Sequence, residues 1–204
     1  LSAALILVLL PALAPAQMAM KEPLFGFWMS ERLEYRDDTD SVLWDMQGWY
    51  GGDYNKFMFK TEGLEGDPDK DAAEFQFLYS RATAAFMDIQ VGLRIDDSDL
   101  GRRHSLAAGI AGDAPYKIEY DAGLFLTEDG DVLLRVEAER DFLLTQRWVL
   151  QPRAELDRPM SGDDSSGFGT DKLEFGLRLR YEASRRFAPY TGVDWKRDFN
   201  DGDT

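Results

Sequence analysis

The sequence predicts an all-β fold, namely an antiparallel up-and-down transmembrane β-barrel of about 12 strands, with 11 of them present in this chain. Three observations predict it. After Gln17 the chain is a succession of segments of about ten residues that alternate apolar with polar residues. Turn-forming residues bound each segment. The connections between segments alternate in length and charge, as the two ends of a barrel do.

The predicted strands follow one another without a competing amphipathic helix. They lie at 26–36, 42–50, 55–64, 72–81, 86–95, 103–111, 116–126, 131–139, 143–156, 171–182 and 188–198. Successive side chains of a strand point to opposite faces, so each alternating segment has one apolar and one polar face. The apolar faces include, in chain order, Trp44, Met46, Gly48 and Tyr50; Ala73, Phe75, Phe77 and Tyr79; Met87, Ile89, Val91, Leu93 and Ile95; Ile118, Tyr120, Ala122, Leu124 and Leu126; and Leu173, Phe175, Leu177, Leu179 and Tyr181.

The opposite faces carry charged and amide side chains. They include Asp45 and Gln47; Lys56, Lys60 and Glu62; Glu74 and Gln76; Asp88, Gln90 and Arg94; Lys117, Glu119 and Asp121; Arg135 and Glu137; Gln151, Arg153 and Glu155; Glu174, Arg178, Arg180 and Glu182; and Asp194 and Lys196. Such a pattern fits a barrel whose apolar side chains face lipid and whose charged side chains face a polar lumen. A soluble sandwich with one solvated face is the alternative interpretation.

The connections favour the barrel. The first, third, fifth, seventh, ninth and eleventh are all acidic, as in "RDDTDS" and "LEGDPDKD", whereas the intervening ones are short. In a meander the odd connections lie at one end and the even ones at the other. Aromatic residues gather at the short-turn end, where an interfacial girdle is expected: Tyr50, Tyr54, Tyr79, Phe86, Tyr116, Tyr181 and Phe187.

The domain organisation follows from these segments. Residues 1–16 contain a short apolar run and a small-x-small pattern at Ala14–Ala16, which is typical of part of a secretory signal peptide. Residues 17–25 form a short periplasmic segment, and residues 26–204 form the outer-membrane barrel. Because bacterial barrels have an even number of strands, we expect a twelfth, C-terminal strand that this chain does not contain.

Composition excludes several classes of protein. The formal net charge of −15 argues against a nucleic-acid partner, because phosphate binding requires a basic surface. Cysteine is absent, which excludes disulfides, thiolate metal sites and cysteine nucleophiles.

The lumen is expected to be narrow. Lysine, arginine and carboxylate side chains on the inner face should pair with one another and partly fill it. The simplest interpretation of each inward charge is a salt-bridged wall residue, and the functional alternative is a narrow, gated path for cations.

Few residues suit metal binding or catalysis. Methionine thioethers suit Cu(I), and the candidates are Met18, Met20 and the inward-facing Met58. The single histidine, His104, stands beside Ser105, but neighbours on a strand point to opposite faces. We therefore expect a rim histidine and no enzymatic activity, against the alternative of a barrel enzyme acting on lipid or peptide.

The order of segments resembles the copper resistance protein B family of Gram-negative outer-membrane proteins. The matching stretches are "LWDMQGWYGGDYNKFMFKTEGLEG", "AEFQFLYSRATAAFMDIQVGLR", "LLTQRWVLQPRAEL" and "LEFGLRLRYEASRRFAPYTGVDW". The resemblance implies an outer-membrane barrel that binds copper ions and sequesters them or moves them across the outer membrane. Family members often carry a Met- and His-rich segment before the barrel, where this chain has only "QMAMKEPLFGFWMS".

The expected partners are outer-membrane lipid and lipopolysaccharide, copper ions and a periplasmic copper protein. The alternative function is that of a structural or small-solute barrel without a copper role.

Overall fold

In the computed structural model, the residues described are 23–36, 40–66, 71–98, 101–161, 171–184 and 187–199. Within these ranges the chain forms one antiparallel sheet. Its strands are β1 (Phe25–Arg36), β2 (Ser41–Gly51), β3 (Asn55–Glu65), β4 (Ala72–Ala84), β5 (Met87–Ser98), β6 (Gly101–Ala114), β7 (Ile118–Thr127), β8 (Val132–Arg140), β9 (Phe142–Leu143), β10 (Trp148–Ser161), β11 (Lys172–Tyr181) and β12 (Tyr190–Asp198). The described ranges contain no helix with the length and apolarity needed to traverse a bilayer.

The topology is an uninterrupted meander. Each long strand pairs with the next one along the chain, in the order β1 to β8, then β10, β11 and β12, and the two-residue β9 pairs with β10 beside this path. The predicted all-β fold and its eleven long strands are therefore confirmed. The predicted strand at 143–156 begins later, at Trp148, because Thr145 Oγ1 accepts hydrogen bonds from the backbone N–H groups of Arg147 and Trp148 and closes a turn there.

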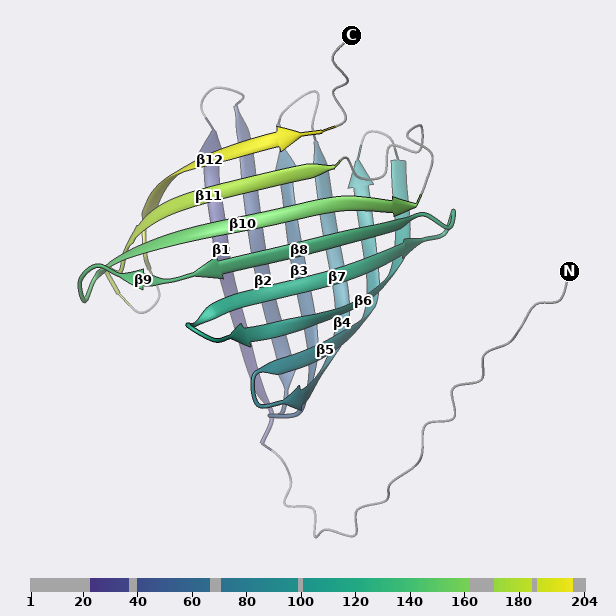
Figure 1. Cartoon of the computed structure of the whole chain (residues 1–204), viewed down its shortest axis with the longest axis horizontal. Helices are drawn as coiled ribbons and strands as arrows, with labels where there is room; N and C mark the ends of the chain where they lie inside the picture. Colours follow the sequence, from purple (N-terminus) through teal and green to yellow (C-terminus); the bar gives the residue numbers. More distant parts are fainter. Residues whose placement is uncertain are drawn as a thin grey trace, which may run out of the picture.

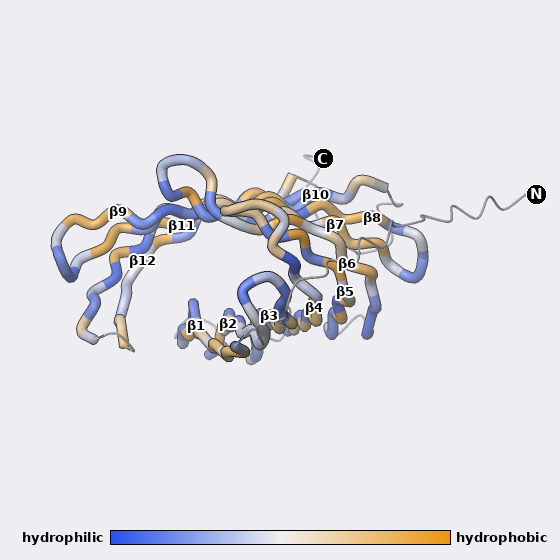
Figure 2. The backbone as a smooth tube through the Cα atoms, turned by 90° about the horizontal axis from the view of Figure 1, so that it is seen from below, coloured by the Kyte–Doolittle hydropathy of each residue, from blue (hydrophilic) through white to orange (hydrophobic). Residues whose placement is uncertain are grey.

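The sheet is curled but not closed. In Figure 1 the strands β1–β4 run behind β7–β12 at a steep angle, and Figure 2 shows the two halves facing each other across the interior. In the described part of the chain, β1 and β12 do not pair, so the ring of the predicted barrel is incomplete. Side chains nevertheless approach across this opening, where Tyr190 Oη donates a hydrogen bond to Glu34 Oε1 at 2.7 Å.

Polar and apolar side chains take the faces that the alternation predicted. Figure 2 shows hydrophilic and hydrophobic residues alternating along strands such as β11 and β12. On β5, Arg94 is 5% exposed and Gln90 is 4% exposed, whereas Leu93 on the opposite face is 53% exposed. The concave side therefore buries charge and the convex side displays apolar residues, which reverses the usual arrangement of a water-soluble domain.

The interior also holds a small apolar cluster, formed by Leu78, Ala107, Phe125 and Leu133. Met58 packs against it. These residues lie on the inward face beside charged neighbours, so part of the interior is filled by close packing as well as by ion pairs.

The tight turns lie at one end of the sheet. Residues 115–117 join β6 to β7, and both Tyr116 and Lys117 adopt the left-handed conformation, with φ of 68° and 58°. The aromatic residues predicted for this end are displayed to the surroundings: Tyr54 is 66% exposed, Phe86 68% and Tyr116 79%. Exposed aromatic side chains therefore gather at the short-turn end, and their role as an interfacial girdle stays a prediction.

One irregularity on β1 changes which side chains reach the interior. The register between β1 and β2 shifts between Ser30 and Arg32, so Glu31 is the extra residue of a β-bulge. Gln47 donates a hydrogen bond to Glu31 Oε1, while Arg32 is 6% exposed. The side chains of two consecutive charged residues, Glu31 and Arg32, therefore both face the interior. In a regular strand they would point to opposite faces.

Candidate functional site

The candidate site is the charged interior enclosed by the curled sheet. Its most connected member is Arg135 of β8, whose Nε lies 2.7 Å from Asp157 Oδ1 and 3.8 Å from Glu155 Oε1 on the neighbouring β10. Its Nη1 lies 2.9 Å from Glu62 Oε1 on β3 and 3.0 Å from Glu74 Oε2 on β4. We call these five residues the Arg135 cluster. It joins two opposite walls of the sheet.

Further ion pairs surround the cluster and hold its carboxylates in place. Arg94 Nη2 lies 2.9 Å from Glu74 Oε2, and Arg153 Nη2 lies 3.0 Å from Glu155 Oε2. Toward β12, Lys172 and Lys196 both pair with Glu174, at 3.1 and 3.2 Å. Removing one partner of a buried pair leaves an uncompensated charge, which typically costs ~3–5 kcal/mol. The network therefore fixes the side chains of the inner wall.

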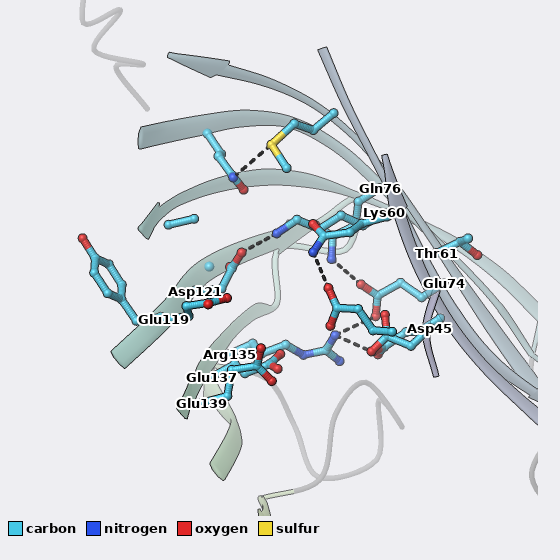
Figure 3. A pocket seen from close by; sticks show the side chains of 18 of the residues that line it. Asp45, Lys60, Thr61, Glu74, Gln76, Glu119, Asp121, Arg135, Glu137 and Glu139 are labelled. Carbon is cyan, nitrogen blue, oxygen red and sulfur yellow. Dashed lines mark hydrogen bonds and ion pairs between the residues drawn. The ribbon is translucent and has the colours of Figure 1, made fainter. Parts of the chain in front are cut away.

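On the short-turn side of the Arg135 cluster lies a cavity of about 280 Å³. Figure 3 shows carboxylates converging on it from several strands, with Lys60 and Arg135 among them and Thr61 pointing away. Nine acidic side chains line it against two basic ones. The acidic residues are Glu31, Asp45, Glu62, Glu74, Asp113, Glu119, Asp121, Glu137 and Glu139. We call it the acidic cavity. A cleft lined by one sign of charge concentrates ions of the opposite sign.

On the side of the acidic connections lies a second cavity, of about 380 Å³. Its lining is mixed in charge, and we call it the loop-side cavity. The basic residues are Arg32, Arg94, Arg103, Arg135, Arg153, Lys172 and Lys196, and the acidic ones are Asp45, Asp96, Asp97, Glu62, Glu74, Glu155, Asp157 and Glu174. Asp45, Glu62, Glu74 and Arg135 line both cavities. The Arg135 cluster thus supplies the boundary between them.

A third cavity, of about 1550 Å³, opens between β1 and the strands β10–β12 near the short turns. Arg178 lines it and is 5% exposed, and its Nε and Nη2 have no hydrogen-bond partner among the described residues. Arg147 also lines it and donates from Nη1 to Tyr181 Oη at 3.1 Å, which raises the pKa of the Arg147 guanidinium. The lining of this third cavity includes both basic and acidic side chains.

Of the three predicted copper ligands, only Met58 falls within the described residues. Met18 and Met20 lie outside them. Met58 lines the acidic cavity, as its parity predicted, and its Sδ accepts a hydrogen bond from Gln90 Nε2 at 3.3 Å. Among the described residues no group of three or more histidine or carboxylate side chains is placed to hold a metal ion. The structure therefore places Met58 inside without assembling a metal site around it.

His104 and Ser105 lie on opposite faces of β6. His104 is exposed, while Ser105 is 2% exposed and belongs to the inner wall. The pair cannot act as a base and its nucleophile, which agrees with the expected rim histidine.

Sequence reasoning placed Arg135 on the inner face but did not single it out. Its neighbours at the same parity on β8 are Glu137 and Glu139, so it is the one basic residue in an acidic run. This arginine among inward-facing acidic residues is the sequence feature that could have identified Arg135. The partners Glu62 and Glu74 come from strands that the linear pattern does not connect to β8.

Comparisons with known proteins identify relatives of the chain. A family described as "Copper resistance protein B precursor (CopB)" matches residues 24–204. A "Copper resistance protein B homolog" from Pseudomonas syringae pv. tomato is 34% identical over 178 residues, which cover 85% of this chain and 60% of the relative. "Copper resistance protein B" from Escherichia coli is 38% identical over 172 residues, covering 82% of this chain and 58% of the relative. The chain thus spans about 60% of the length of these curated relatives.

Proposed function

The chain belongs to the Copper resistance protein B family, and from that premise we propose that it is an outer-membrane β-barrel that binds copper ions and sequesters them or moves them across the outer membrane. The family supports a role in copper resistance. Binding, sequestration and transport are the steps that we add to it. The activity is non-enzymatic in this proposal, and copper is the cargo.

The proposed membrane location is supported by the distribution of side chains, because charged residues are buried and large apolar residues are exposed. Charged residues such as Glu174, at 4% exposure, are buried, whereas Phe77, Val91 and Trp195 are 39%, 46% and 59% exposed on the convex face. Water-soluble monomers rarely display large continuous apolar patches. In a lipid bilayer these apolar side chains contact hydrocarbon in place of water. Such a location suits strands with one apolar and one polar face. The partners of the convex face are then outer-membrane lipid and lipopolysaccharide.

Two features support copper as the cargo. The acidic cavity has a large excess of carboxylates over basic groups, which attracts cations. Met58 offers a thioether, a ligand type suited to Cu(I), on the wall of the same cavity. Met18 and Met20, close to the start of the barrel, are further proposed ligands, and a periplasmic copper protein is the proposed partner that delivers or receives the ion.

Deleting the gene tests the copper role. We expect a lower copper concentration to stop growth of the deletion strain, and a plasmid copy of the gene to restore tolerance. The copper content of the cells should also differ between the deletion strain and the wild type. The direction of this difference distinguishes uptake from export or storage. Unchanged growth and unchanged copper content would contradict the proposal.

Two substitutions test the thioether ligands. Met58→Leu keeps the volume and removes the sulfur, so we expect weaker Cu(I) binding by the purified barrel without loss of folding. Met46→Leu is the matched control, because Met46 lies on the convex face of β2 and should leave Cu(I) binding unchanged. Equal Cu(I) affinity of the two variants would remove Met58 from the site.

A membrane assay tests the location without copper. A folded barrel in detergent should migrate differently on a gel before and after boiling, and it should require detergent to stay in solution. A detergent-free monomer would contradict the barrel proposal.

The second candidate function is a structural or small-solute barrel without a copper role. The observation that favours it is the ion pairing of the interior, since Arg135, Arg94 and Arg153 already neutralise many inward carboxylates. Copper titration of the purified barrel distinguishes the two, because a barrel of this kind should show no selective copper site.

A further inference from the structure

The position of the Arg135 cluster has a consequence for any ion that passes along the interior. The acidic cavity and the loop-side cavity share Asp45, Glu62, Glu74 and Arg135 and therefore meet at this layer. An ion that moves from one cavity to the other across this shared boundary passes beside the Arg135 guanidinium. Figure 3 shows this side chain extending from its own strand toward the carboxylates of the opposite wall.

The contacts of Arg135 divide into two sets. Asp157 and Glu155 come from β10, which pairs directly with β8, so these contacts hold Arg135 against its own wall. Glu62 and Glu74 come from β3 and β4 on the far wall, and the contacts at 2.9 and 3.0 Å cross the interior. The guanidinium could therefore leave the second set while keeping its contacts with the first.

Arg135 supplies the positive charge of this layer. A guanidinium remains protonated at any physiological pH, so Arg135 keeps a fixed positive charge between the carboxylates of the two walls and occupies the place that a cation would take. Its side chain is 17% exposed and that of Glu74 is 8% exposed, so solvent screens the layer weakly. Without Arg135, the carboxylates of Glu62, Glu74, Glu155 and Asp157 would converge on the boundary and attract cations.

We propose that Arg135 is the barrier and the specificity-determining residue of a cation path through the barrel interior. A cation passes when the guanidinium leaves Glu62 and Glu74 and stays with its partners Glu155 and Asp157 on β10. This inference rests on the proposed function, because it requires a barrel that spans a membrane.

Conductance of the full-length protein in planar lipid bilayers with KCl on both sides tests the proposal. We expect low conductance for the wild-type barrel and an increase on the order of tenfold for Arg135→Gln, with the reversal potential in a KCl gradient shifted toward that of K⁺. Arg135→Lys keeps the charge and should stay close to the wild type. Arg102→Gln is the matched control, because Arg102 pairs with Asp97 near the start of β6 with its side chain 62% exposed.

A second pair of variants covers the case in which Arg135→Gln does not fold. Glu62→Gln combined with Glu74→Gln releases Arg135 from the far wall and leaves its contacts with β10, and it should also raise conductance. Because the chain has no cysteine, Gln47→Cys places a single thiol on the acidic cavity. A cationic thiol reagent added on the side of the acidic connections should label it faster when the Glu62 and Glu74 carboxylates are replaced.

The outcomes separate this inference from the copper role. Equal conductance of the wild type, Arg135→Gln and Arg102→Gln, all folded by gel mobility, would overturn the barrier. Unchanged labelling of the Gln47→Cys thiol would overturn it as well. Increased K⁺ conductance in a barrel that shows no copper binding would support the barrier while the copper proposal fails. Failure of every variant to insert into the bilayer would overturn the membrane barrel and the barrier together.

Discussion

Leu93→Arg tests whether lipid contacts the convex face of the sheet. Leu93 lies near the middle of the 12-residue β5 and is 53% exposed. A strand of this length is roughly 40 Å long and, tilted by about 40°, covers the ~25 Å apolar band of an outer membrane. An arginine near the bilayer midplane costs about 2–4 kcal/mol. We therefore expect the ratio of folded to unfolded protein to fall roughly 30- to 700-fold.

The measurement is denaturant unfolding of the barrel in lipid vesicles, followed by tryptophan fluorescence. His104→Arg is the matched control, because His104 is exposed on the same face of the neighbouring β6, close to the acidic connections. A charge near the interface costs only about 0–1 kcal/mol. If the convex face contacts water instead, both variants should stay within about 0.5 kcal/mol of the wild type. That result would refute the lipid-facing assignment.

Two further predictions concern side-chain contacts on the convex face, one a packing contact and one a hydrogen bond. A Cβ at Gly48 would lie 2.5 Å from Trp28 Cε3, so Gly48→Ala should lower the free energy of unfolding by roughly 1–3 kcal/mol. Gly26→Ala, where the nearest atom would be Tyr50 Cδ2 at an ordinary 3.6 Å, should change it much less, and equal effects in the same unfolding assay would contradict the packing argument. Trp44→Phe removes the hydrogen bond from Trp44 Nε1 to Thr61 Oγ1 and should cost about 0.5–1.5 kcal/mol. A double-mutant cycle with Thr61→Val checks it, and additive effects would show that the bond contributes nothing.

The strands and their orientation were predictable because a period of two is a local property of the chain. Glu74 and Gln76 are buried and Phe77 and Tyr79 are exposed, as the alternation around them requires. The bulge at Glu31 was not predictable in this way, since the flanking residues of β1 carry no turn signal. The inner side chains were identified, but their partners depend on how strongly the sheet curls, which no local pattern contains.

Met58 and Arg135 illustrate the same limit within the candidate site. Parity alone placed both side chains on the inner face. The packing of Met58 against the apolar cluster depends on residues of β4, β6, β7 and β8, and the reach of Arg135 to Glu62 depends on two walls coming together. The sequence therefore predicted which residues face the interior but not the division of the interior into separate cavities.

The meander order also separates early from late events in folding. Among the described residues, each long strand pairs with the next long strand along the chain, so each hairpin closes a short loop at small entropic cost. The contacts of Arg135 with Glu62 and Glu74 span 73 and 61 residues and form only after several hairpins have curved into a shell. A refolding experiment should therefore detect two stages. The hairpins should form first, and the ion pairs of Arg135 with Glu62 and Glu74 should form last.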